Sequence, residues 1–426
     1  MRILIFVSLT WLCLLPLKAE LTIDNCQKKA YENYPLVRQY DLLEKSKSYN
    51  ISNANKLYLP QISVSGRATY QSDVVEIPFK FPLFTFDEIS KDQYQVVGEI
   101  NQIVWDGGAV SGQKNIINAT SEIEKNKLSV ELYNLKDRIN QLFFGILLIR
   151  ESIKRNEQLI LELEKNLERV TSLWENGVVS EADVNSLKVE IINANQRKTE
   201  LKGNEKSYRK MLSILIGEDI DDNQILIVPS TTEDSNEFKN SNLNNLLTKR
   251  PEIELFQAQE NLFSHQTENL NNGRYPKIGL FFQAGYGRPG FNLLKNDFSF
   301  YYIGGIRLSW NLSSFYNVYN NEELLIINKK SIEVQKENFL FNNNIKYNQY
   351  KVEIEKYNEL LKNDDEIISL RYKIKQSSEA RLENGTISIT DLIHDINAEN
   401  LAKLDKTIHE IQLLLSIYNY KFLVNE

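Results

Sequence analysis

Residues 175–183 read ENGVVSEAD and residues 383–391 read ENGTISITD, and these two stretches decide the fold. They share five of their nine residues at a constant offset of 208 positions. A glycine that follows a helix commonly ends it in a left-handed cap. A serine and then an acid three residues later are typical of the first turn of a new helix. Each stretch therefore predicts a sharp turn between two helices.

Long helices are expected on both sides of each turn. All nine prolines lie at or before Pro289, and none falls within residues 83–228 or 290–426. Because proline breaks helix interiors, both zones can form uninterrupted helices. From Leu128 to Trp174, one stripe of residues advances in alternating steps of three and four, and only Asn156 in it is polar. A spacing of about 3.5 residues predicts a coiled-coil seam. The predicted helices are about 24–56, 108–175, 180–216, 246–272, 314–383 and 388–423.

Four stretches alternate apolar and polar residues with a period of two, which predicts β-strands. They lie at about 61–71, 94–104, 277–287 and 298–311 and are rich in Tyr, Phe and Trp. Their length and aromatic content suit a transmembrane β-barrel, although strands of a soluble sheet show the same alternation. On the polar faces, Arg67, Glu99 and Arg307 are either pore-lining residues or ordinary solvated ones.

A physical constraint links these strands to oligomerisation. Four amphipathic strands cannot close a membrane barrel, because about eight is the practical minimum and lipid tolerates no open sheet edge. A membrane location therefore requires several copies of the chain. Two copies would supply eight strands and three would supply twelve, and the sequence alone does not choose between them.

The whole arrangement occurs twice along the chain. Tyr34-Pro35 is repeated as Arg250-Pro251, and Leu59-Pro60 is repeated as Tyr275-Pro276. We interpret this as duplication followed by divergence. The predicted divisions are a first structural repeat at 20–217, a polar linker at 218–245 and a second repeat at 246–426.

Residues 1–19 have the parts of a secretory signal peptide, with Arg2, an apolar run and Ala19 before a plausible cleavage site. The apolar run is shorter than a standard membrane-spanning helix. Cys26 would be the only cysteine of the mature chain, so no internal disulfide is expected. The net charge of −7 makes nucleic acid a poor candidate partner.

We expect no enzymatic activity, cofactor or metal site. His265, His394 and His409 do not have the spacing of metal ligands. The sequence contains no phosphate-binding glycine loop of the usual spacing and no nucleophile elbow.

These features together resemble the TolC-like outer-membrane efflux protein family over essentially the whole mature chain. The resemblance rests on Pro35 and Pro251, on Pro60 and Pro276 at the strand entries, on Trp105-Asp106-Gly107-Gly108 at the strand exit, and on the two Glu-Asn-Gly turns. It implies a mainly α protein with a small β part. Three chains would share one twelve-stranded transmembrane β-barrel, continued by a periplasmic α-helical barrel.

The function that this resemblance implies is an outer-membrane channel subunit of a tripartite efflux or type I secretion system. Such a homotrimer is a passive conduit from a periplasmic entrance to the cell exterior. Its partners would be a periplasmic adaptor (membrane fusion protein), an inner-membrane transporter and outer-membrane lipid. The exported substrate, whether drug, metal or protein, is not specified by the sequence.

The resemblance also implies two sets of functional residues. The helix turns would contact the adaptor through Asn176, Gly177, Val178, Asn384, Gly385 and Thr386. The periplasmic entrance and its selectivity would depend on Asp391, His394, Asp395 and Asp183.

Asp391 matches a position where the family carries an acidic ring, which would favour cations. His394 departs from the family pattern because it stands where a second acid is found, and it would make the entrance pH-sensitive if it faces the lumen. Leu382 and Ile387 stand where some members have polar latch residues. The structural alternative for the turn residues is that the glycines, serines and acids only cap helices.

A periplasmic adaptor or scaffold protein with coiled-coil hairpins is the alternative function. Such a protein would be peripheral and water-soluble. Adaptors resemble a single hairpin inserted in a β-domain, whereas two strand pairs here each lead into two helices. The duplication therefore favours the channel.

Overall fold

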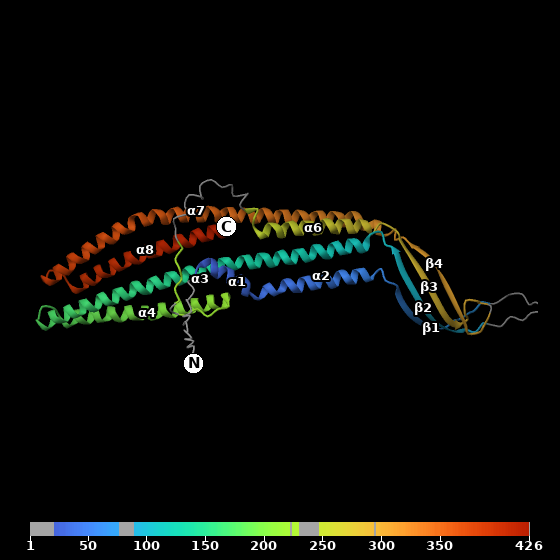
Figure 1. The fold of residues 1–426 in the computed structure, drawn as a ribbon, viewed down its shortest axis with the longest axis horizontal. Helices are drawn as coiled ribbons and strands as arrows, with labels where there is room; N and C mark the ends of the chain where they lie inside the picture. The colour runs from blue at the N-terminus through green and yellow to red at the C-terminus, as the bar shows by residue number, and fades with distance from the viewer. Residues whose placement is uncertain (1–20, 76–88, 222–223, 230–246, 294, 426) are drawn as a thin grey trace, which may run out of the picture. The chain divides into compact units, whose positions relative to one another are not determined.

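The computed structural model describes residues 21–75, 89–221, 224–229, 247–293 and 295–425. The predicted signal peptide and most of the predicted linker lie outside the described residues. The elements follow in the order α1 (Ile23–Asn33), η1 (Pro35–Arg38), α2 (Gln39–Lys56), β1 (Gln61–Tyr70), β2 (Asp92–Trp105), α3 (Ala109–Glu175), α4 (Glu181–Ile216), α6 (Pro251–Asn272), β3 (Lys277–Arg288), β4 (Ser299–Ser309), α7 (Ser314–Glu383) and α8 (Ile389–Val424) (Figure 1).

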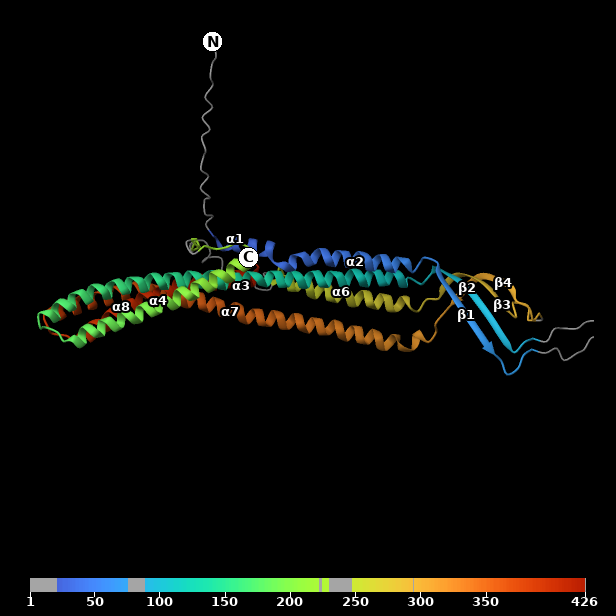
Figure 2. The same ribbon diagram turned by 90° about the horizontal axis from the view of Figure 1, so that it is seen from below.

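This order confirms the predicted fold class. The described chain is mainly helical with one four-stranded antiparallel sheet, and a strand pair followed by a long helix and a second helix occurs twice. Figures 1 and 2 both show α4 alongside α3, and Figure 1 shows α8 alongside α7. In the described residues, no helix is both long enough and apolar enough to cross a membrane.

The first predicted helix differs from the structure because it is not continuous. α1 ends at Asn33, and Tyr34 has an extended backbone with φ −66° and ψ 127°. The residue before a proline is pushed out of the helical region by the proline ring, so Pro35 forces the break. By contrast, Pro251 lies at the first position of α6, where proline fits because that N–H has no partner in the helix.

The chain divides into two compact units. The hairpin unit comprises Met1–Val37, Val130–Arg250 and Phe339–Glu426, and the sheet unit comprises Arg38–Ser129 and Pro251–Asn338. The long helices α3 and α7 each contribute residues to both units. Each unit also takes segments from both halves of the duplication.

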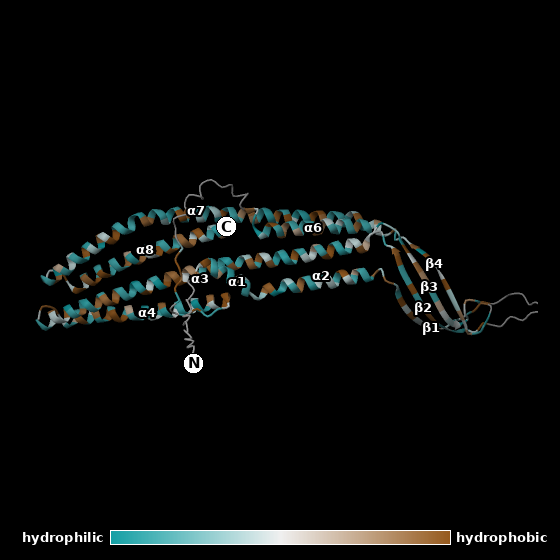
Figure 3. Ribbon diagram, viewed as in Figure 1, coloured by the Kyte–Doolittle hydropathy of each residue, from teal (hydrophilic) through white to brown (hydrophobic). Residues whose placement is uncertain are grey.

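In the sheet unit, the strands pair in the order β1-β2-β3-β4. The register places apolar residues on one face, with Ile62 opposite Ile100 and Ile100 opposite Phe282. The hydropathy colouring alternates along all four strands (Figure 3). Ile62, Val64 and Ile306 are each about three-quarters exposed on the apolar face. The sheet therefore has a wide apolar surface that the described part of the chain leaves uncovered.

Asp106 joins the sheet to the long helix α3. Its carboxylate accepts hydrogen bonds from the N–H groups of Gly108 (3.0 Å) and Val110 (2.6 Å) and from the Tyr58 hydroxyl (3.1 Å). Gly107 and Gly108 have φ of 70° and 90°, a turn that side chains disfavour. Burial acts to raise the pKa of Asp106, but the hydrogen bonds outweigh it and the pKa is lowered. The charged carboxylate therefore satisfies N–H groups at the start of α3.

The hairpin unit has its main core where α1, α3, α4 and α8 meet around Phe143 and Phe144. Cys26 lies in this core, and burial raises the pKa of its thiol to about 12. Arg250 is 4% exposed and donates to the Phe422 carbonyl at 3.1 Å, with its guanidinium 4.6 Å from the Tyr133 ring centre. A cation at the last carbonyls of α8 is favourable because that helix end carries partial negative charge.

Candidate functional site

The first helix turn ends α3 with a full Schellman motif. The Gly177 N–H donates to the Trp174 carbonyl and the Val178 N–H donates to the Leu173 carbonyl, both at 2.9 Å. Gly177 has φ 71° and nothing within 4 Å of where a side chain would begin. The Asn176 side chain donates to the Ser172 carbonyl at 2.7 Å. The predicted left-handed glycine cap is confirmed.

The second turn repeats this geometry at the end of α7. The Gly385 N–H donates to the Leu382 carbonyl and the Thr386 N–H donates to the Arg381 carbonyl, both at 2.9 Å. Gly385 has φ 65° and an equally open Cβ position. The Asn384 side chain donates to Ala380 at 2.8 Å. The two repeated sequences therefore form the same pattern of hydrogen bonds. In both turns, the Cβ position of the glycine is open.

Each turn leads into a helix through a capping box. Ser180 caps α4, and its hydroxyl donates to the Asp183 carboxylate at 2.7 Å while accepting from the Asp183 N–H at 3.3 Å. Ser388 caps α8 in the same way, at 2.7 Å and 3.2 Å from the corresponding Asp391 atoms. The predicted capping role of both serines is confirmed. Each aspartate accepts a hydrogen bond from the backbone N–H of the serine that caps its helix.

The two aspartates differ in exposure. Asp391 is exposed, whereas Asp183 is half-buried. The Ser388 hydroxyl and the Ser388 N–H both donate to the Asp391 carboxylate and lower its pKa. Only one Asp391 oxygen is used in the capping box. An exposed, persistently charged carboxylate therefore lies beside the second turn.

His394 and Asp395 are neighbours in sequence but lie in different surroundings. The His394 side chain is 77% exposed, and its Nδ1 lies 3.5 Å from an Asp395 oxygen. The other Asp395 oxygen accepts a 2.6 Å hydrogen bond from Ser378 of α7. Asp391 and His394 are thus solvent-facing residues near the start of α8, whereas Asp395 also holds α8 to α7. Their predicted role at an entrance remains a proposal.

Next to the turns, α3, α4, α7 and α8 all contribute side chains to one apolar cluster. Leu382 is 2% exposed within it, and Ile387 packs against it. Val179 and Ile387 precede the capping serines, at the position of a hydrophobic staple. Where some members of the family have polar latch residues, Leu382 and Ile387 make apolar contacts within this chain.

Ion pairs join the two hairpins of the same unit. Arg169 of α3 lies 2.5 Å from Glu383 of α7. Farther from the turns, Lys375 of α7 pairs with Glu162 of α3 and with Glu399 of α8. Burial acts against these charges, but the mutual hydrogen bonds outweigh it, raising the Lys375 pKa and lowering that of Glu399. Sequence reasoning missed this buried group.

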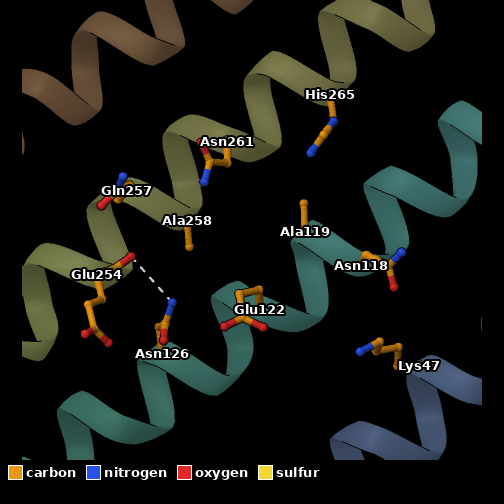
Figure 4. A pocket seen from close by; sticks show the side chains of 10 residues that line it. All are labelled: Lys47, Asn118, Ala119, Glu122, Asn126, Glu254, Gln257, Ala258, Asn261 and His265. Atoms are coloured by element: carbon orange, nitrogen blue, oxygen red, sulfur yellow. Dashed lines mark hydrogen bonds between the residues drawn. The ribbon is translucent and has the colours of Figure 1, made fainter.

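A concave region lies in the sheet unit between α2, α3 and α6 (Figure 4). It encloses about 490 Å³, and Ala119 and Ala258 lie on its walls among amide side chains. Asn126 donates to the Glu254 carbonyl at 3.4 Å, and His265 contacts Glu268 at 3.1 Å. Among the described residues, no group of three or more His, Cys, Asp or Glu could hold a metal ion. This hollow supplies no evident chemistry.

Comparison with known proteins gives matches in structure but not in sequence. No protein-family model matches the sequence, and no curated protein does. Among the solved structures that match, three examples each cover 94% of this chain. The Campylobacter jejuni CmeC outer membrane channel has 14% identity and a TM-score of 0.69 over 85% of its own chain. The outer membrane protein VceC from Vibrio cholerae has 10% identity and a TM-score of 0.67 over 94%. The open-state Neisseria gonorrhoeae MtrE outer membrane channel has 10% identity and a TM-score of 0.67 over 88%.

Each match covers 94% of this chain. At 10% to 14% identity the likeness is one of fold. It agrees with the independent evidence of the duplicated strand pairs and helix turns. The chain therefore has the fold of the TolC-like outer-membrane efflux proteins.

Proposed function

We propose that this chain is one subunit of a trimeric outer-membrane channel, a passive conduit in a tripartite efflux or type I secretion system. The observation that supports it most is the exposed apolar face of the sheet in a chain with the TolC-like fold. Three copies of the four-stranded sheet would supply twelve strands, enough to close a barrel without free edges.

The distribution of aromatic residues on that face supports a membrane location. Near the strand ends that adjoin the helices lie Trp105 and Trp310, with Tyr58 and Tyr275 just before β1 and β3, and all four are partly exposed. At the opposite ends lie Tyr70, Tyr94, Tyr286 and Phe300. Between them the face is mainly aliphatic, with Phe282 and Tyr302 stacked at 6.2 Å as exceptions. Two aromatic girdles around an apolar band of about 25 Å are typical of outer-membrane barrels.

The opposite sheet face suits an aqueous bore. Arg67 of β1 donates to Gln95 of β2 at 3.2 Å, and Arg307 of β4 contacts Asn101 and Glu99 of β2 at 3.2 Å and 3.4 Å. Arg67 bridges neighbouring strands and Arg307 reaches across β3, and such polar side chains can remain hydrated in a pore. Lipid on the same face would leave these charges without water.

The turns are the proposed contact surface for a periplasmic adaptor. Val178 is 54% exposed, and the Cβ positions of Gly177 and Gly385 are open. Two adjacent turns without projecting side chains at their glycines allow close approach of another helix. We propose contacts through Asn176, Gly177, Val178, Asn384, Gly385 and Thr386, and an entrance lined by Asp391, His394, Asp395 and Asp183. An inner-membrane transporter would complete the assembly.

The decisive experiment is expression of the full sequence in a Gram-negative host, followed by membrane fractionation and mass measurement in mild detergent. The expected result is an outer-membrane trimer that conducts ions in planar bilayers. A water-soluble periplasmic species would contradict the channel and support the adaptor alternative.

Two neighbouring residues give a matched test of the membrane face. Val64 lies on the apolar face of β1 and Ser65 on the polar face. Val64→Arg should reduce outer-membrane assembly, because a lipid-facing arginine costs about 2–4 kcal/mol near the bilayer midplane. Ser65→Arg should assemble normally. Equal assembly of both variants would contradict the proposed orientation of the sheet.

A further inference from the structure

Two aromatic residues break the pattern of the polar sheet face. Phe281 of β3 and Tyr301 of β4 have the register of polar-face positions, since Phe281 lies opposite Asn101 and Tyr301 lies opposite Gly285. Both are half-buried, whereas Phe282 and Tyr302 on the other face are 45% and 71% exposed. If the polar face lines a pore, large rings would obstruct it unless they lie flat against the wall.

Each of these rings lies opposite a glycine on the neighbouring strand. Tyr301 pairs with Gly285, and Phe281 pairs with Gly305. A Cβ atom added at Gly285 would be 2.4 Å from the Tyr301 Cζ and 2.8 Å from its Cε1. A Cβ atom at Gly305 would be 3.2 Å from the Phe281 Cε1. The rings therefore occupy the space that side chains at these two positions would need.

Further contacts show that the rings follow the wall. Gln95 on β2 donates to the Tyr301 hydroxyl, so the Tyr301 side chain crosses the whole of β3 from its own strand β4. Gly285 is buried as a result. The Arg307 guanidinium lies 4.7 Å from the centre of the Phe281 ring while contacting Asn101 and Glu99. Glycine paired with an aromatic ring is a known way to pin strand register.

We infer that Gly285 and Gly305 are positioning residues that set the free bore of the channel. They let the Tyr301 and Phe281 rings lie against the barrel wall instead of projecting into the lumen. This inference rests on the proposed function, because it requires the polar face to line a pore. In a trimer, each glycine and its paired ring would occur three times around the bore.

The physical consequence of a methyl group at Gly285 follows from these distances. The clash involves the far end of a side chain that rotates about single bonds, so the ring yields before the backbone does. Moving away from β3, the ring loses the hydrogen bond from Gln95 and can only turn toward the open side of the sheet. A small substitution in the wall would thus narrow the pore by displacing a larger group.

The test is single-channel conductance of the full-length protein in planar bilayers. Gly285→Ala should lower the conductance, and the double variant Gly285→Ala/Tyr301→Ala should restore it at least to the wild-type value. Gly66→Ala is the matched control, because Gly66 lies on the apolar face and a Cβ atom there would be 4.0 Å from its nearest neighbour, the Gln95 carbonyl oxygen. Its conductance should equal that of the wild type.

Unchanged conductance in Gly285→Ala, or loss that Tyr301→Ala does not reverse, would overturn the inference. A wild-type protein that forms no channel would instead overturn the proposed function. If Gly285→Ala does not assemble, Gly305→Ala with Phe281→Ala as its reversal decides the question. Gly305→Ala should also lower the conductance, and Phe281→Ala should restore it. The loss should be smaller than for Gly285→Ala, because the contact at Gly305 is longer.

Discussion

Lys375 lies with its ammonium nitrogen 2.6 Å from the carboxylate of Glu399, where the two side chains are only 8% and 1% exposed. Lys375 also binds Glu162, and Glu399 also binds Lys403 at 2.5 Å. This group joins α3, α7 and α8 within the hairpin unit. Two carboxylates and two ammonium groups balance in charge, which is how buried ions become tolerable.

Lys375→Met should destabilise the protein by about 3 kcal/mol, because it leaves Glu399 buried with one cation fewer. The measurement is the midpoint of guanidinium unfolding in mild detergent. Lys362→Met is the control, since its ion pair with Glu359 is exposed and should contribute about 0.5 kcal/mol or less. Equal midpoints for the two variants would show that the buried group contributes no more than a surface pair.

Gly385→Ala should destabilise the second turn by about 1 kcal/mol, because an L side chain at positive φ is strained. Gly203→Ala is the matched comparison: it lies inside α4, and neither glycine has an atom within 4 Å of its Cβ position. That variant should be about 0.5–1 kcal/mol more stable than the wild type, because alanine favours helix interiors. Shifts of the same sign in thermal unfolding would contradict a role for backbone conformation at Gly385.

Asp106→Asn should weaken the start of α3 by about 1 kcal/mol, because the carboxylate serves two N–H groups there. The folded-state pKa of Asp106 is lowered. Its contribution is therefore present above the ordinary aspartate pKa and is lost as the pH falls through the lowered value.

Unfolding midpoints measured between neutral and acidic pH would test this dependence. The difference between the wild type and Asp106→Asn should shrink as the pH falls. Asp219→Asn is the control, with a side chain that is 91% exposed, and should show little effect at any pH. A constant difference across the pH range would argue against the carboxylate as the cause.

How much of the candidate site could be predicted from sequence depends on how far apart the interacting residues lie along the chain. The glycine caps and capping boxes were predictable because each involves residues within six positions. The buried ion group was not, since Lys375 and Glu162 are 213 positions apart. One signal was present: Glu399 continues the helical stripe of Leu392 and Ile396, where a charge is unexpected.

The same distinction holds for the fold. The period of two predicted which strand residues share a face, because alternation is intrinsic to a strand. The break at Tyr34-Pro35 was also a local signal, and the prediction of one helix over 24–56 overlooked it. The close contact of Tyr301 with Gly285 depends on strand register, which alternation alone does not fix.

Asp391→Asn should reduce the cation preference of the channel in planar bilayers, if Asp391 lies at the periplasmic entrance. The measurement is the reversal potential in a salt gradient. Because the Ser388 hydroxyl and N–H lower the pKa of Asp391, the wild-type contribution should persist below the ordinary pKa of an aspartate. Asp183→Asn should have a smaller effect, since Asp183 is the less exposed of the two.

The control must separate charge from helix capping, because Asp391 has both roles. Ser388→Ala removes the capping hydroxyl and leaves the carboxylate in place, so it should lower stability by about 1 kcal/mol without changing the reversal potential at neutral pH. Asp391→Asn should change the reversal potential with a smaller stability loss, because an amide oxygen can still accept from the Ser388 N–H. If Asp391→Asn leaves selectivity unchanged while the channel still conducts, Asp391 acts as a helix cap only and the entrance lies elsewhere.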